Sequence, residues 1–144
     1  MRHTTALLDV NVLIALLDPH HVHHELCHGW FADRGAAPWA SCAMTQNAVL
    51  RILGNPRYPN SPGPPPTIAP HLDSLVEHPG HEFWDSNPSL LSQGFIARSA
   101  LIDYAQITDL YLLALARHHG GTLATLDQRI KVDGSQESLE LIRP

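Results

Sequence analysis

The fold is decided by the stretch TALLDVNVLIALLDP, residues 5–19. Its first part, Thr5–Asp9, is a short apolar run typical of a buried strand. The second part, Val12–Leu17, is an apolar segment that follows almost at once and ends at Asp18-Pro19. A strand that leads directly into a helix is the start of a β-α-β unit, so this stretch predicts a sheet with helices packed against it.

The rest of the chain alternates in the same way between short apolar runs and amphipathic segments. We expect helices over His20–Asp33, Thr45–Leu53, Ile68–Val76 and Thr108–His119, and strands over Trp39–Cys42, Glu82–Trp84, Thr122–Thr125 and Leu139–Ile142. The helix from Thr108 is the clearest, because Thr108 is a good N-terminal cap and Gly120 ends it. Parallel strands need crossover helices, which cover both faces of a sheet. The pattern predicts an α/β fold with a central, mainly parallel sheet of four or five short strands.

The composition fits one globular domain spanning residues 1–144. Hydrophobic residues make up 44% of the chain and charged residues only 16%, a balance that argues against disorder and against a coiled coil. The two cysteines, Cys27 and Cys42, are too few for a disulfide framework and indicate reduced thiols. The longest apolar run, Val12–Leu17, is far short of the ~20 residues that span a bilayer, and no signal peptide is recognisable. These features predict a cytoplasmic protein with no membrane partner.

Seven of the twelve prolines lie in one segment, residues 55–70. Proline removes backbone hydrogen-bond donors and disrupts helix interiors, so we expect this segment to be an extended surface loop within the domain. Two roles are open for it: a passive connector, or a flap that contacts a substrate or partner.

Three aspartates stand out by their positions. Asp9 ends the first strand, Asp127 follows the strand Thr122–Thr125, and Asp109 lies in the first turn of the preceding helix. Ligands of open parallel sheets bind at the carboxyl ends of the strands, where these side chains would meet. Converging carboxylates repel one another unless a cation lies between them, and oxygen-only ligands suit Mg²⁺ or Mn²⁺. The alternative is that each aspartate is an ordinary cap or turn residue.

Three motifs in the sequence resemble those of the PIN-domain ribonucleases. Residues 7–16, LLDVNVLIAL, are similar to the opening motif of that family, residues 108–116, TDLYLLALA, to its third acidic motif, and residues 123–127, LATLD, to its fourth. Their spacing and the chain length resemble those of VapC-type toxins of bacterial toxin–antitoxin pairs. The resemblance covers essentially the whole chain.

The resemblance implies a three-layer α/β/α sandwich and an endoribonuclease that hydrolyses RNA with Mg²⁺ or Mn²⁺. In that reading Asp9, Asp109 and Asp127 hold the metal, which activates a water molecule and neutralises charge on the scissile phosphate. It also implies a small antitoxin protein as partner, and a homodimer. Five further residues are candidates for supporting the metal ligands or contacting RNA: Asn11, Thr125, Thr108, Arg51 and His21.

The sequence departs from the family at Gln46, where most members have an acidic residue. A glutamine offers a neutral carbonyl oxygen to the metal or its water but no charge, so a second metal is in doubt. The alternative function is therefore a domain with weak or no nuclease activity that binds RNA or a protein. An aspartyl-phosphate phosphatase or a receiver domain fits poorly, because Asn11 stands where the former needs an acid and no lysine ends a late strand.

The segment from residue 20 to residue 28 contains five histidines: His20, His21, His23, His24 and His28. Helical i, i+4 spacing would allow a zinc site, but a solvated helix surface, or a contact of His21 or His24 with RNA, is also open.

The net charge of −5 argues at first against an RNA partner. If three aspartates hold one metal ion, however, the remaining surface carries only −2 (−5 + 3).

Overall fold

The computed structural model describes residues 4–101, 103–130 and 136–144. Its centre is a five-stranded sheet in which every neighbouring pair is parallel, in the order β3-β2-β1-β4-β5. The strands are β1 (Ala6–Leu8), β2 (Trp39–Cys42), β3 (His81–Trp84), β4 (Thr122–Thr125) and β5 (Leu139–Leu141). The predicted parallel sheet of short strands is confirmed.

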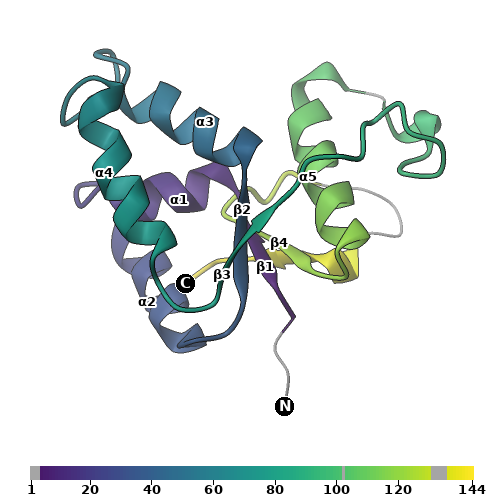
Figure 1. Cartoon of the computed structure of the whole chain (residues 1–144), viewed down its shortest axis with the longest axis horizontal. Coiled ribbons are helices and arrows are strands. Elements are labelled where there is room, and N and C mark those ends of the chain that lie inside the picture. The colour runs from purple at the N-terminus through teal and green to yellow at the C-terminus, as the bar shows by residue number, and fades with distance from the viewer. Residues whose placement is uncertain (1–3, 102, 131–135) are drawn as a thin grey trace.

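Helices cover both faces of the sheet, which confirms the three-layer sandwich. They are α1 (Val10–Leu17), α2 (His24–Arg34), α3 (Ala43–Leu53), α4 (Pro65–Val76) and α5 (Ile107–His118). Figure 1 shows the first four on one side of the sheet and α5 on the other. No helix within the described ranges is both long and apolar enough to cross a membrane.

The alternation of side chains along the strands divides the core between the two faces. In β1, Ala6 and Leu8 belong to the cluster under α1 to α4, whereas Leu7 belongs to the cluster under α5. In β2, Trp39 faces the first group and Ala40 the second. Because all these side chains are buried, the strands read in the sequence as continuous apolar runs.

The expectation of an extended loop over residues 55–70 is wrong for its last part, because α4 begins at Pro65. Prolines occupy the first positions of this helix, where a backbone N–H has no partner within the helix and its loss costs little. Pro70 lies inside the helix. The helix is held in place by its buried side chains Ile68, Leu72 and Leu75.

Helices α2 and α5 also begin elsewhere than expected. Helix α2 begins at His24 rather than His20, after a turn in which the carboxylate of Asp18 accepts from the backbone N–H of His20. Helix α5 begins at Ile107, so Thr108 lies inside its first turn and is not the N-terminal cap. A 3₁₀ turn at Tyr104–Gln106 runs directly into this helix, and its last bond is made by the N–H of Ile107.

Candidate active site

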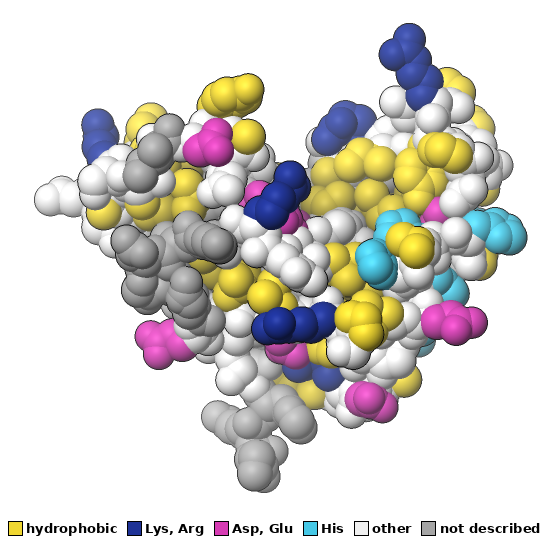
Figure 2. Space-filling view, turned by 180° about the vertical axis from the view of Figure 1, so that it is seen from behind, with side chains coloured by type: hydrophobic (Ala, Val, Ile, Leu, Met, Phe, Trp, Pro, Cys, Tyr) yellow, Lys and Arg dark blue, Asp and Glu magenta, His cyan; other side chains and the backbone are white. Residues whose placement is uncertain are grey.

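The carboxyl ends of the strands open into a hollow between the two helical layers. Figure 2 shows this hollow from behind, with acidic and basic side chains side by side at its base and a hydrophobic wall beside them. Asp9 follows β1 there and caps α1: its Oδ1 accepts from the N–H of Val10 at 2.8 Å. Only 5% of Asp9 is exposed, and its own N–H donates to the carbonyl of Ala124 in the neighbouring strand.

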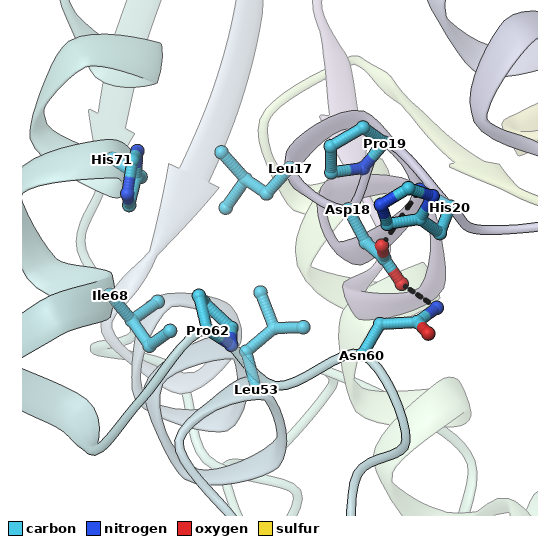
Figure 3. A pocket seen from close by; sticks show the side chains of 9 residues that line it. All are labelled: Leu17, Asp18, Pro19, His20, Leu53, Asn60, Pro62, Ile68 and His71. Carbon is cyan, nitrogen blue, oxygen red and sulfur yellow. Dashed lines mark hydrogen bonds between the residues drawn. The ribbon is translucent and has the colours of Figure 1, made fainter.

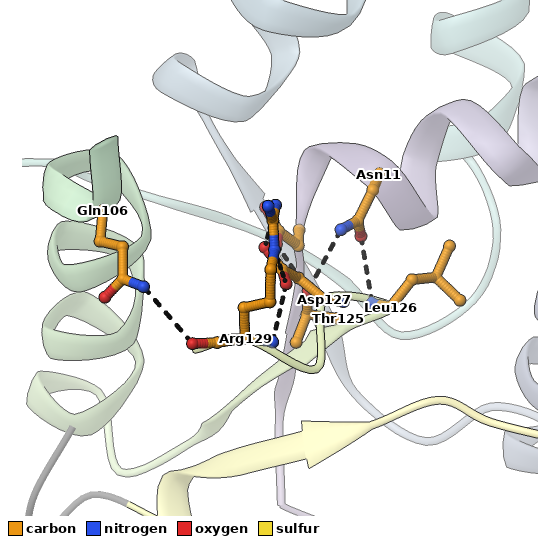
Figure 4. Close-up of polar contacts among 7 residues, drawn as sticks. Asn11, Gln106, Thr125, Leu126, Asp127 and Arg129 are labelled. Carbon is orange, nitrogen blue, oxygen red and sulfur yellow. Dashed lines mark hydrogen bonds and ion pairs between the residues drawn. The ribbon is translucent and has the colours of Figure 1, made fainter. Parts of the chain in front are cut away.

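Thr125, at the end of β4, holds the parts of this site together. Its fully buried hydroxyl donates to Oδ2 of Asp9 at 2.7 Å. The Thr125 hydroxyl oxygen also accepts from Nδ2 of Asn11 at 3.2 Å and from the backbone N–H of Asp127 at 3.0 Å. Asn11 also accepts from the N–H of Leu126 at 3.3 Å (Figure 4). Asn11 and Thr125 therefore fix the start of α1 to the loop that carries Asp127.

Asp109 reaches the same region from the other layer. It is half-buried in the first turn of α5, and its side chain makes no hydrogen bond among the described residues. Burial, together with the charges of Asp9 and Asp127, raises its pKa from 3.8 to about 6, although Arg129 acts in the opposite direction. Burial also raises the pKa of Asp9, partly offset by its hydrogen bonds with Thr125 and Val10. The three carboxylates thus lie close enough to interact electrostatically.

Asp127 is paired with Arg129. The Arg129 side chain donates to Asp127 at 3.1 Å and 3.3 Å, and its backbone N–H donates at 2.8 Å. These hydrogen bonds, chiefly those of the guanidinium, lower the pKa of Asp127 against the opposing effect of its burial. Gln106, just before α5, donates to the carbonyl of Arg129 at 3.4 Å. The pairing of Arg129 with Asp127 is set by the turn that joins the two residues.

The donor set fits a hard divalent cation, since it consists of carboxylate and hydroxyl oxygens. As the side chains stand, no three acidic, histidine or cysteine groups within the described residues are already arranged to enclose a metal ion. Arg129 is bound to the Asp127 oxygens that such an ion would need. A cation would therefore replace the guanidinium rather than fill a finished cage.

Gln46, on α3, is held by a hydrogen bond to a residue of strand β2. Its amide donates to Oγ of Ser41 at 2.9 Å, and Ser41 is hydrogen-bonded to Nε2 of His81 at 2.7 Å. Burial lowers the pKa of His81, with Glu82 acting against it. In the tautomer with Nε2 unprotonated, a neutral His81 accepts a hydrogen bond from the Ser41 hydroxyl, and Ser41 accepts from the amide of Gln46. The sequence did not indicate Ser41 or His81, because this contact depends on the pairing of β2 with β3.

The remaining candidates lie in different places. Thr108 is exposed next to Asp109, and Arg51 is exposed on α3. His21 lies beyond the far end of α1, near Asp18, so the structure separates it from Asp9 by the length of that helix, about 12 Å.

Two of the histidines hold α2 against α1. Nδ1 of His24 lies 2.7 Å from the carbonyl oxygen of Ala15, and Nε2 of His28 lies 3.1 Å from that of Leu16. A carbonyl oxygen only accepts, so Nδ1 of His24 and Nε2 of His28 carry protons and donate to α1. The structure gives these two histidines a packing role, and no three His, Cys, Asp or Glu side chains in the described part of the chain are arranged to hold a zinc ion.

A separate pocket of about 420 Å³ lies at that far end of α1, between Leu17, Leu53 and Ile68 (Figure 3). The buried Asp18 on its rim accepts from the hydroxyl of Tyr58 at 2.5 Å and from Asn60 at 2.9 Å. The first part of the proline-rich segment is therefore tied to α1 rather than loose.

Comparison with known proteins identifies the family. The sequence profile of the PIN domain matches residues 6–133, which include all three aspartates. The chain belongs to the PIN-domain family. It is 46% identical over 128 residues to the ribonuclease VapC44 of Mycobacterium tuberculosis, with 87% of each chain covered. It is 34% identical over 138 residues to the ribonuclease VapC39 of the same organism, with 96% of this chain and 99% of that one covered.

The fold of this PIN domain is also similar to a solved structure. The crystal structure of VapBC2 from Rickettsia felis, bound to a DNA fragment from their promoter, superposes with a TM-score of 0.59 over 85% of this chain and 88% of that chain. The two sequences are 13% identical, so this similarity shows a shared fold and no more.

Proposed function

We propose that this PIN domain is the toxin of a toxin–antitoxin pair and an endoribonuclease that depends on Mg²⁺ or Mn²⁺. The observation that carries the proposal is the proximity of Asp9, Asp109 and Asp127 at the carboxyl end of the sheet, where burial and the charges of Asp9 and Asp127 raise the pKa of Asp109. The likeness to VapC44 and VapC39, both named ribonucleases, supports RNA as the substrate.

The chain's own residues have distinct parts in this reaction. Asp9, Asp109 and Asp127 would hold the cation, which when bound supplies Lewis acidity and lowers the pKa of a water molecule. Thr125 keeps the Asp9 carboxylate oriented and desolvated. Arg129 pairs with Asp127, and its planar guanidinium would match phosphate oxygens if a cation took its place there.

Cleavage of a structured RNA labelled at one end tests this activity. Wild-type protein is incubated with Mg²⁺ or Mn²⁺ and, separately, with EDTA, and the Asp9→Asn variant is tested with metal. We expect cleavage that is lost in EDTA and in Asp9→Asn, but kept in Asp73→Asn, a control at an exposed position on α4. Binding of the RNA without cleavage at any metal concentration would instead identify a nuclease-dead module, the function to which Gln46 points.

The toxin role rests on the same relatives and is tested in cells. Expression of the wild-type chain is expected to arrest growth, and co-expression of a small protein encoded directly upstream is expected to restore it. Growth arrest that persists in Asp9→Asn would separate toxicity from RNA cleavage. By family resemblance we also propose a cytoplasmic homodimer, which light scattering of the purified protein would detect as twice the chain mass.

A further inference from the structure

A second groove lies at the carboxyl edge of the sheet. It has a volume of about 360 Å³ and lies between the first turn of α3, the first turn of α5 and the segment that follows β3. Its lining residues are Met44, Ser86, Pro88, Ser89, Leu90, Ile107, Thr108 and Tyr111. Met44 follows the carboxyl end of β2, Ser86 follows that of β3, and Thr108 lies in the same first turn of α5 as Asp109. The groove therefore lies at the same edge of the sheet as the proposed reaction centre.

The walls of this groove are mainly apolar and carry no charged side chain. Met44 is 38% exposed, a high value for a large apolar side chain. Tyr111 fixes the segment after β3, because its hydroxyl lies 3.0 Å from the carbonyl of Ser86 and 2.9 Å from that of Pro88. The groove is thus already formed, with one adaptable side chain at its mouth.

One buried polar atom in the lining has no hydrogen-bond partner among the described residues. Oγ of Ser86 is buried and makes no hydrogen bond within the described part of the chain. A buried hydroxyl without a partner is unfavourable unless a bound molecule supplies one.

We propose that this groove binds a base of the RNA substrate, that of a nucleotide next to the scissile phosphate. The inference rests on the proposed function. A nucleobase is neutral and flat, with apolar faces and a polar edge. Those properties match uncharged apolar walls and one unsatisfied hydroxyl, whereas a phosphate finds no cation here. A nucleotide whose phosphate lies at the carboxylates carries its base one sugar away, within reach of a groove at the same edge of the sheet.

Substrates that lack a single base test this assignment. An RNA oligonucleotide cleaved by the wild type is prepared with an abasic nucleotide on either side of the cleaved bond. We expect kcat/KM to fall about tenfold for one of the two abasic substrates, the effect of losing one apolar contact surface. Met44→Ser should show a similar loss on the intact RNA and no further loss on that abasic RNA. Ser86→Ala should change the preference among the four bases at that position.

Leu90 and Leu91 provide a matched pair of variants. Leu90 lines the groove and Leu91, which is 73% exposed, does not. Leu90→Ser is expected to reproduce the effect of Met44→Ser, and Leu91→Ser to behave as the wild type. Circular dichroism shows whether each variant is folded.

Three results would overturn the assignment. One is equal cleavage of intact RNA by Met44→Ser and wild type. Another is an equal loss on intact and abasic RNA. The third is unchanged cleavage by Met44→Ser with weaker inhibition by the antitoxin, which would show that the groove binds a protein partner. Binding of the same RNAs to Asp9→Asn, measured by fluorescence anisotropy, tests the groove without cleavage and so separates its failure from that of the nuclease.

Discussion

Replacing Asp109 with asparagine should make the protein more stable while removing its activity. The Asp109 carboxylate has no hydrogen-bond partner in the described structure. Its burial and the nearby charges of Asp9 and Asp127 raise its pKa from 3.8 to about 6. At about 1.4 kcal/mol for each pKa unit, the charged form costs the fold up to about 3 kcal/mol at pH 7.5. Solvent screening at this half-buried position reduces the effect to about 1–2 kcal/mol. Asparagine has nearly the same shape and carries no charge.

The pH dependence of this stability difference shows whether the charge on Asp109 causes it. Because the pKa of Asp109 is higher in the folded state, its contribution to stability is fully present below about pH 3.8 and is lost as the pH rises through 6. Urea unfolding in EDTA, followed by tryptophan fluorescence, should show Asp109→Asn more stable than wild type at pH 7.5 and about equally stable at pH 4. Asp73→Asn, an exposed control, should differ by less than about 0.5 kcal/mol. A variant that is less stable at pH 7.5, or a difference that does not shrink at pH 4, would refute the reasoning.

Three further substitutions test other contacts. Thr125→Val removes the hydroxyl donor of Asp9 in a buried site and should lower the free energy of unfolding by about 2–4 kcal/mol in urea titrations, with Thr125→Ser recovering most of it. Arg129→Gln removes the cation that competes for Asp127, so calorimetry should detect tighter binding of Mn²⁺; unchanged binding would count against that competition. Asp18→Asn weakens the anchor of the segment at Tyr58. Hydrogen bonds hold the pKa of Asp18 below its usual value despite burial. The wild type should therefore have a higher melting temperature than Asp18→Asn above pH 4, and this difference should vanish as the pH falls through the folded pKa. RNA cleavage per folded molecule should be unchanged.

Local patterns predicted most of the fold. The strands Trp39–Cys42 and Thr122–Thr125 have the bounds that the sequence indicated, since each is a buried run between clear turns. The prolines hide the start of α4 at Pro65, because proline disrupts helix interiors but is well tolerated in a first turn. Thr108 was expected to be a cap, but the preceding 3₁₀ turn already begins the helix.

The site was predictable in its acidic residues and not in their partners. Asp9, Asp109 and Asp127 lie where parallel strands and a helix terminus bring them to one edge of the sheet, a rule that applies to the fold class as a whole. The contact of Gln46 with Ser41, and of Ser41 with His81, arises from side chains on three elements whose relative placement the sequence does not encode locally. Their roles in catalysis stay predictions until they are measured.

The rate of RNA cleavage as a function of free Mn²⁺, compared between wild type and Asp127→Asn, tests the central claim most directly. The three-carboxylate site predicts a saturable dependence on the metal, no cleavage in EDTA, and a half-saturating concentration at least about tenfold higher in the variant. Cleavage that continues in EDTA, or an unchanged half-saturating concentration in Asp127→Asn, would contradict it.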